Sequence, residues 1–418
     1  MTDVSHLLEP LFRRQSAQIV ATLTRVIGTR HLALAEDAVQ EALMAALQQW
    51  PYRGVPDDPA GWLFRVARNR ALDRLRHQTM VANKAPTIAG ISQSQPADVP
   101  VALLAHELPT LDDDQLAMMF LTCHPILSRE ARVALTLKLV GGFSVGEIAR
   151  AFLVQDSAVA QRLVRAKRLL REGDLPLGPP AAADLGDRLD SVLESIYLMF
   201  NEGYAATAGD ALIREDISAE AIRLAALLTR HPGTAAPRTW ALLALLLLHA
   251  ARFASRSGSE GELSLLRDQD RSRWDGALIA EGLRALDRAA AGDEISTYHL
   301  EAEIAACHAV ARQWTETDWP RILRCYDQLA ELTGSPIVAL NRAIAKAHVA
   351  GVGASIADLE ALESTLALKG YHLLPAVLAE LWRQLGDFPR ATQYYREALT
   401  LAEAGPERRF LTARLDAL

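Results

Sequence analysis

Residues 155–171 contain the side chains whose types and spacing best suit a chemical task, the reading of DNA. The sequence QDSAVAQRLVRAKRLLR brings Gln161, Arg162 and Arg165 within five positions of one another. Arginine can form two hydrogen bonds with guanine and glutamine can do so with adenine, so these side chains are candidates for contact with base edges. The cations that follow them are candidates for phosphate contacts, which position a protein on DNA without reading its sequence: Lys167, Arg168 and Arg171.

Two helices have to position these side chains. Ser144 is followed three residues later by Glu147, a capping box that begins a short helix ending near Phe152. A second helix is predicted from residues 155–157 to Arg171. Its apolar residues recur at helical spacing and define a buried stripe, formed by Val159, Leu163, Ala166 and Leu170. The residues predicted to face outward are Ala158, Gln161, Arg162, Arg165 and Arg168.

This arrangement of a short helix, a tight turn and an outwardly cationic helix is typical of a helix-turn-helix. The second helix of that motif enters the major groove of DNA. The alternative is a solvated basic helix without a DNA partner, and the pattern alone leaves both interpretations open.

A second cationic helix is predicted over residues 59–76, PAGWLFRVARNRALDRLR. It contains five arginines and a single acidic residue, Asp73. Its apolar residues form an inner face, made of Leu63, Val66, Ala67, Ala71 and Leu75. The polar residues available on the outside are Arg65, Arg68, Asn69 and Arg76.

Three segments together, residues 35–46 (AEDAVQEALMAA), 59–76 and 127–171, resemble a bacterial RNA polymerase sigma factor of the extracytoplasmic-function type, in the sigma-70 family. They stand in the order and spacing of sigma regions 2 and 4. The resemblance implies a protein that binds core RNA polymerase, directs it to specific promoters and helps to open the −10 region.

The resemblance also implies a polymerase-docking segment. Residues 35–46 would bind the coiled coil of the β′ clamp, and region 4 would contact the β flap. Four residues of this segment share one helical face and form the expected docking stripe: Asp37, Gln40, Glu41 and Met44. A solvated helix face without a partner is the alternative.

Residues 59–76 would recognise and open the −10 element. Unstacking a base costs a few kcal/mol, and stacking on an aromatic side chain returns roughly 1–3 kcal/mol per base. Trp62 stands at the aromatic position of the family, although a place in the core suits it equally well. The residues that the resemblance assigns to the −10 element are Trp62, Arg65, Arg68, Asn69 and Arg76.

Residues 127–171 would form region 4 and read the −35 element. The assigned DNA contacts are Ala158, Gln161, Arg162, Arg165, Lys167 and Arg168. One departure concerns the turn, where the family commonly has glycine or a small residue and this chain has Leu153. A less tight turn is therefore expected. The predicted domains are region 2 at residues 1–78, a linker at 79–107 and region 4 at 108–173.

The C-terminal part, residues 187–418, is helix-patterned throughout and resembles the long tetratricopeptide-like tail of one subgroup of these sigma factors. Gly351 and Gly386 lie 35 residues apart in similar helix–turn–helix segments, close to the tetratricopeptide period of about 34. Unrelated antiparallel hairpins could give the same pattern. Stacked repeats form a concave surface suited to a peptide or domain partner, so an unidentified protein partner is expected.

Charge is divided unevenly along the chain. Residues 1–178 hold 20 Lys and Arg against 18 Asp and Glu, a net +2, whereas residues 179–418 hold 24 against 33, a net −9. A near-neutral front half can still bind DNA where its cations cluster. The contrast suggests that the acidic tail contacts regions 2 and 4 and holds them closed, although a tail required for activity is equally compatible with it.

Several other classes of protein are disfavoured. Three cysteines without a CxxC pair indicate no disulfide framework and fit a cytoplasmic protein. The apolar run WALLALLLLHAARFA is too short to span a membrane and is predicted to be a buried helix. Asp268, Asp270 and Asp275 lack a fourth metal ligand, so we expect helix caps and an arginine–aspartate network around Trp274. No cofactor, metal or enzymatic activity is expected.

The sequence therefore predicts an all-α sigma factor with a C-terminal helical repeat domain. The rival hypothesis is a stand-alone helix-turn-helix regulator with a tetratricopeptide-like sensor domain. That rival uses residues 143–172 in the same way but leaves residues 35–76 without a purpose.

Overall fold

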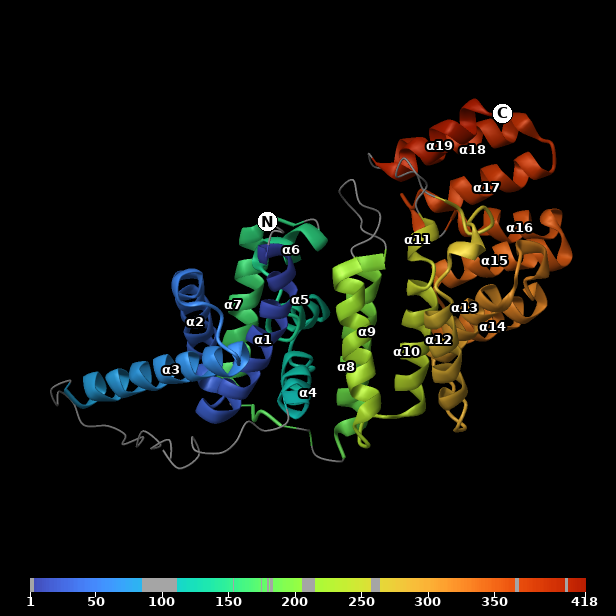
Figure 1. Cartoon of the computed structure of the whole chain (residues 1–418). Coiled ribbons are helices and arrows are strands. Elements are labelled where there is room, and N and C mark those ends of the chain that lie inside the picture. The colour runs from blue at the N-terminus through green and yellow to red at the C-terminus, as the bar shows by residue number, and fades with distance from the viewer. Residues whose placement is uncertain are drawn as a thin grey trace. The chain divides into compact units, whose positions relative to one another are not determined.

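The computed structural model of the chain describes residues 4–84, 111–152, 154–173, 175–178, 180, 183–204, 215–256, 264–364, 368–402 and 405–418. Within these ranges every regular element is a helix (Figure 1), which confirms the predicted all-α fold. The chain divides into two compact units, unit 1 (Met1–Leu198) and unit 2 (Met199–Leu418). The boundary between them falls within helix α8 (Leu185–Tyr204).

Unit 1 is built from two groups of helices that follow one another along the chain. They are α1 (Val4–Ile27), α2 (Leu32–Arg53) and α3 (Pro59–Lys84), then α4 (Leu111–Thr122), α5 (Arg129–Leu139), α6 (Val145–Ala151) and α7 (Asp156–Glu172). Helix α1 packs against α2 and α3 and also against α4, and α5 packs against α6 and α7. A 3-10 turn, η1 (Thr29–His31), joins α1 to α2 and contacts α7.

Helix α3 is longer than the sequence pattern indicates. The sequence predicts a linker that begins at residue 79, whereas the helix continues to Lys84. Residues 81–84 (VANK) lack the apolar periodicity that marks a helix, yet the first helix-breaking proline comes only at Pro86. The rest of the expected linker, residues 85–107, lies outside the described residues.

Unit 2 begins with helices that surround α10 (Pro237–Ala250). This helix packs against α9 (Glu215–Arg230), α12 (Gly276–Ala289) and α13 (Thr297–Val310), and every residue from Leu242 to Leu248 is buried. The predicted buried helix is thus confirmed. A Cβ atom added at Gly282 of α12 would lie 2.8 Å from Leu248 Cγ, so this glycine permits the close approach of α12 to α10.

The remaining helices of unit 2 pack in sequence, each against the next. They are α14 (Trp319–Thr333), α15 (Pro336–Ala350), α16 (Val352–Leu362), α17 (Leu373–Gln384), α18 (Phe388–Leu401) and α19 (Pro406–Asp416). Gly351 separates α15 from α16 with φ of 90°, and Gly386 separates α17 from α18 with φ of 80°. Both predicted turn glycines therefore adopt backbone conformations that other residues rarely reach. The tetratricopeptide assignment itself stays a prediction.

Two of the three aspartates near Trp274 begin helical elements, which confirms the predicted caps, whereas the predicted arginine–aspartate network around Trp274 stays a prediction. Asp270 accepts a hydrogen bond from Ser272 N and begins η3 (Arg271–Arg273), and Asp275 caps α12 by accepting from Ala277 N and Leu278 N. Arg252 and Arg271 lie over the Trp274 ring, with the guanidinium of Arg271 4.8 Å from its centroid. Among the described residues no cluster of three or more His, Cys, Asp or Glu side chains could hold a metal ion. No helix in the described ranges is long and apolar enough to cross a membrane.

Candidate nucleic-acid interface

The short helix of the predicted motif begins with the capping box that the sequence indicates. Ser144 Oγ accepts a hydrogen bond from Glu147 N at 3.2 Å, and Glu147 Oε2 accepts one from Ser144 N at 2.7 Å. Helix α6 ends at Ala151 and α7 begins at Asp156. The turn residue Leu153 lies outside the described residues, so the expected loosening of the turn stays a prediction.

Helix α7 presents one apolar and one polar side. The predicted stripe is confirmed, since all four of its members are buried: Val159, Leu163, Ala166 and Leu170. The opposite side exposes Ala158, Gln161, Arg165 and Arg168. Arg162 and Lys167 are half-buried at the border between the two sides. Because α5 and α6 pack on the apolar side, the polar side of α7 is held by a rigid support.

Helix α3 has the same two-sided construction. Leu63, Ala67 and Ala71 are buried, whereas Val66 and Leu75 of the predicted inner face are only half-buried. The outer side exposes Arg65, Asn69 and Arg76, with Arg68 half-buried beside them.

Trp62 packs against another indole instead of standing alone. Its ring centroid lies 5.5 Å from that of Trp50 on α2, in an edge-to-face arrangement. Trp50 is buried and Trp62 half-buried. Trp62 is therefore part of the contact between α2 and α3, and it is not fully buried there.

The predicted docking stripe on α2 is largely exposed, but its two acidic side chains form ion pairs with arginines of α3. Asp37, Gln40 and Met44 are exposed and Glu41 is half-buried. Arg74 of α3 forms ion pairs with both acids, at 3.3 Å to Asp37, and Arg70 lies 3.8 Å from Glu41. These pairs orient α2 on α3 and leave the stripe less acidic than its sequence indicates.

An apolar patch adjoins this stripe. The side chain of Met44 is 59% exposed and that of Leu47 is 73% exposed. Sequence reasoning missed Leu47, although its spacing of three from Met44 and seven from Gln40 puts it on the same helical face. Large apolar side chains exposed next to polar groups are typical of protein contact surfaces.

Comparison with known proteins assigns these segments. Residues 11–80 match sigma-70 region 2 and residues 117–170 match sigma-70 region 4. The chain belongs to the sigma-70 family of RNA polymerase sigma factors. Residues 188–290 match a family of unknown function (DUF6596), which makes the chain similar to an extracytoplasmic-function sigma factor with a C-terminal extension.

Two relatives illustrate the range of similarity. RNA polymerase sigma factor CarQ of Myxococcus xanthus is 30% identical over 174 residues, which cover 40% of this chain and 91% of CarQ. A protein of Rhizobium meliloti (strain 1021) that is described as uncharacterized is 38% identical over 391 residues, covering 93% of this chain and 91% of the relative. The second relative thus shares the C-terminal extension, whereas the match to CarQ covers a length close to that of unit 1.

Region 2 and the helices around region 4 contact one another within unit 1. Lys167, predicted to touch a phosphate, has its ammonium 2.5 Å from the carboxylate of Glu36 on α2. Both side chains are largely shielded from water. Burial lowers the pKa of the neighbouring Lys138, against the opposing charge of Glu36. The sequence did not indicate this pair, because its members are 131 residues apart.

Two further contacts hold these parts together. Asp114 of α4 accepts a hydrogen bond from Thr22 of α1 at 2.7 Å and lies 2.8 Å from the guanidinium of Arg25. Thr29 donates a hydrogen bond of 2.8 Å to the carbonyl of Leu175, beyond the end of α7. Region 2 and α7 are thereby fixed in one packed arrangement.

Proposed function

We propose that this chain is a sigma factor that binds core RNA polymerase, directs it to specific promoters and helps to open the −10 region, without catalytic activity of its own. The observation that carries the proposal is the occurrence of regions 2 and 4 in one chain, each with a buried apolar side and an exposed polar side on the helix assigned to DNA. The protein would act in the cytoplasm, where RNA polymerase works.

In this proposal α7 reads the −35 element through Gln161, Arg162 and Arg165, and Arg168 and Lys167 contact phosphates. Helix α3 holds the −10 element, with Arg65, Asn69 and Arg76 on its exposed side. The Met44–Leu47 patch and the adjoining polar stripe of α2 dock on the β′ clamp, and region 4 contacts the β flap. Transfer of such an apolar patch out of water contributes about 25 cal/mol for each Å², before the entropic cost of association is subtracted.

The packed arrangement of unit 1 has a consequence for this mechanism. A compact unit of 198 residues has a radius of gyration of about 16 Å, equivalent to a sphere roughly 42 Å across. The −35 and −10 elements are separated by about 25 positions, or about 85 Å along B-DNA at 3.4 Å per step. Regions 2 and 4 therefore have to separate before one molecule can contact both elements. The contacts that have to break include those of Glu36 with Lys167, of Thr22 and Arg25 with Asp114, and of Thr29 with Leu175.

The C-terminal half would modulate this activity. Its net charge of −9 suits contact with the arginine-rich helices of regions 2 and 4, and its helical repeats suit an additional protein partner. Such contacts would favour either the packed or the separated arrangement of unit 1. A tail that favours the packed arrangement would inhibit transcription, and one that favours the separated arrangement would activate it.

Run-off transcription with purified core polymerase tests the proposal. We expect transcripts from a selected promoter only when the chain and core polymerase are both present. A truncated chain that ends at Leu198 tests the tail, because it keeps Glu194, which pairs with Arg129 at 2.7 Å and Arg132 at 3.2 Å. Promoter binding by the chain alone, with no new transcripts on addition of core, would instead identify a stand-alone regulator.

A further inference from the structure

Unit 2 contains a half-enclosed cavity of about 630 Å³. Its walls come from α14, α15, α17, α18, α19 and the loop at residues 265–267, which precedes η3. Cavities of roughly 300–1,000 Å³ are the size that binds small organic molecules. Nothing in the function of regions 2 and 4 uses this space.

Stacked aromatic rings line one side of the cavity. The indoles of Trp314, in the 3-10 turn η4 (Trp314–Glu316), and Trp319 meet edge to face with centroids 4.8 Å apart. His348 of α15 stacks on Trp319 at 3.8 Å and nearly parallel, and the ring of His308 is parallel to that of Trp314 at 6.0 Å. Planar groups bind favourably against such rings in offset or edge-to-face contact. The cavity therefore suits a flat aromatic ligand.

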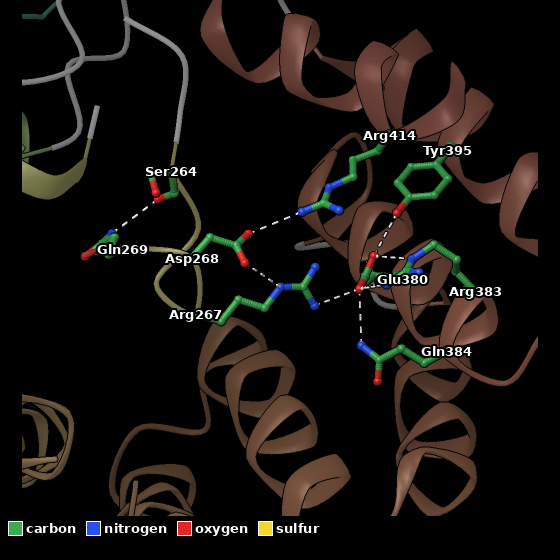
Figure 2. A network of polar contacts seen from close by, with 9 residues as sticks. All are labelled: Ser264, Arg267, Asp268, Gln269, Glu380, Arg383, Gln384, Tyr395 and Arg414. Carbon is green, nitrogen blue, oxygen red and sulfur yellow. Dashed lines mark hydrogen bonds and ion pairs between the residues drawn. The ribbon is translucent and has the colours of Figure 1, made fainter. Parts of the chain in front are cut away.

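The charged groups at the opposite side are already paired with one another. Glu380 accepts hydrogen bonds from Arg267 at 2.8 Å, Arg383 at 2.7 Å and Tyr395 Oη at 3.0 Å (Figure 2). Asp268 lies 3.6 Å from Arg267 and 3.3 Å from Arg414. The carboxylate of Glu407 lies 3.2 Å from His372 Nε2.

These pairs leave the cavity without an unpaired charge to offer. Among the described residues, three arginines face the carboxylates of Glu380 and Asp268, and the carboxylate of Glu407 faces His372. The three arginines and the three carboxylates balance one another in charge. The two histidines among the aromatic rings are neutral at pH 7, since burial lowers the pKa of His308 to about 3 and desolvation also lowers the pKa of His348. Because a charged ligand would lose its hydration without gaining a counter-ion, the site favours an uncharged one.

The loop at residues 265–267 closes one side of the cavity, which would otherwise be an open groove along the helices. Leu265 and Leu266 line it, and Arg267 ties the loop to Glu380 of α17. Figure 2 shows this loop beside the helices that carry Glu380 and Tyr395. A peptide bound along the repeat helices would have to displace the loop and its ion pairs, whereas a small molecule fits beside it.

We propose that this cavity binds an uncharged, planar aromatic small molecule that stacks against Trp314 and Trp319. The site goes beyond promoter recognition. Its use as the signal input of the C-terminal half rests on the proposed function, but binding itself does not require polymerase.

Binding is tested on the full-length chain with N-phenyl-1-naphthylamine, an uncharged fluorophore with a planar naphthalene ring, and with 8-anilino-1-naphthalenesulfonate, an anion built on the same ring system. We expect saturable binding of the uncharged probe at one site per chain, with quenching of tryptophan emission. The anion should bind about tenfold more weakly or not at all. Equal affinity for both probes would overturn the charge argument, and absence of saturable binding would overturn the proposal.

Two variants with opposite effects on the cavity locate the site. Trp319→Ala removes a stacking surface, and Ile344→Trp fills space in a lining position on α15. Each should weaken binding of the uncharged probe by about tenfold or more. The matched control is Trp240→Ala, because Trp240 packs under Arg288 and does not line the cavity.

A thermal unfolding curve of each variant, recorded by circular dichroism, shows whether the variant is folded. If one cavity variant is not folded, the other alone is sufficient to locate the site. Unchanged affinity in a folded cavity variant would overturn the proposal. Displacement of the bound probe by an alternating alanine–leucine octapeptide would also overturn the proposal, since it would assign the cavity to a peptide.

Discussion

Thr22 on α1 donates a hydrogen bond of 2.7 Å to Asp114 on α4, and both residues are 1% exposed. This contact joins region 2 to the helix that leads into region 4. A buried carboxylate is stable only when its charge and lone pairs are compensated, and Arg25 supplies the charge at 2.8 Å. The packed arrangement of unit 1 thus includes a buried polar contact that can be weakened by a change of one atom.

The first prediction concerns that contact. Asp114→Asn keeps the shape of the side chain but removes the charge that faces Arg25. We expect local opening of α1 and α4 to cost about 1–3 kcal/mol less, so that their amides exchange roughly 5- to 150-fold faster. Hydrogen exchange of the full-length chain measures this. Asp73→Asn is the control, because Asp73 is exposed and forms only a 3.6 Å pair with Arg76; equal effects of the two substitutions would contradict the assigned role of Asp114.

The second prediction concerns the pair of Lys167 and Glu36. Glu36→Gln removes the carboxylate that pairs with Lys167, so region 2 and α7 should separate at a lower cost. We expect promoter binding by the reconstituted holoenzyme to become roughly 2- to 10-fold tighter. The slope of log affinity against log salt should stay the same, because Lys167 is released in the wild-type complex as well. Filter binding over a range of salt concentrations gives both quantities.

A matched control for this prediction is Glu172→Gln. Glu172 pairs with Arg168 at 3.7 Å, but both side chains are exposed, so Arg168 can reach DNA without the substitution. Glu172→Gln should therefore change the affinity less than Glu36→Gln does. An unchanged affinity in Glu36→Gln would mean that the pair of Glu36 and Lys167 does not restrain the separation of region 2 from α7.

The third prediction separates base reading from phosphate contact on α7. Arg165→Ala should cost about 1–3 kcal/mol at the promoter and relax the preference at one base pair of the −35 element. Arg168→Ala should weaken all sequences alike and reduce the salt slope by about 1. Competition between promoter variants that differ at single −35 positions distinguishes the two. Uniform weakening in both variants would assign Arg165 to the backbone as well.

The features that sequence predicted correctly are those set by local spacing. The buried stripe of α7 follows from apolar residues such as Val159 and Leu163 at helical intervals, and the beginning of α6 follows from Ser144 and Glu147, three residues apart. The turns at Gly351 and Gly386 follow from the freedom of glycine to adopt positive φ. Each of these features depends on fewer than about twenty consecutive residues, so it can be recognised in the sequence without knowledge of the tertiary fold.

The features that sequence could not predict depend on residues far apart in the chain. Thr22 meets Asp114 across 92 positions, and Arg267 meets Glu380 across 113. The aromatic cavity takes its lining residues from several helices and from the loop at residues 265–267, so no single segment marks it. Lys167 illustrates the result: its type and position suggested a phosphate contact, whereas packing of α7 near α2 gives it Glu36 as an internal partner.

The final prediction concerns the acid stability of unit 2. Burial alone would raise the pKa of Glu380, but the hydrogen bonds from Arg383 and Arg267 and the charge of Arg267 outweigh it and hold the pKa at about 2, below the ordinary value of 4.5. Because the unfolded chain binds the proton more readily, the ionised carboxylate stabilises the folded state above about pH 4.5. This contribution, on the order of 3 kcal/mol, is lost as the pH falls from 4.5 towards 2.

Glu380→Gln should therefore lower the thermal midpoint of unit 2 at pH 7 and flatten its dependence on pH between 4.5 and 2, as measured by calorimetry of the full-length chain. Glu397→Gln, at an exposed position on α18, is the control and should leave both unchanged. A second loss of stability, which begins as the pH falls below about 6.5, should persist in Glu380→Gln. It comes from His308, because burial and, to a smaller extent, the charge of Arg252 lower the pKa of this histidine to about 3. Protonation of that histidine in the unfolded chain destabilises the fold independently of Glu380. Wild-type acid sensitivity in Glu380→Gln would show that the arginines around Glu380 do not stabilise its ionised form.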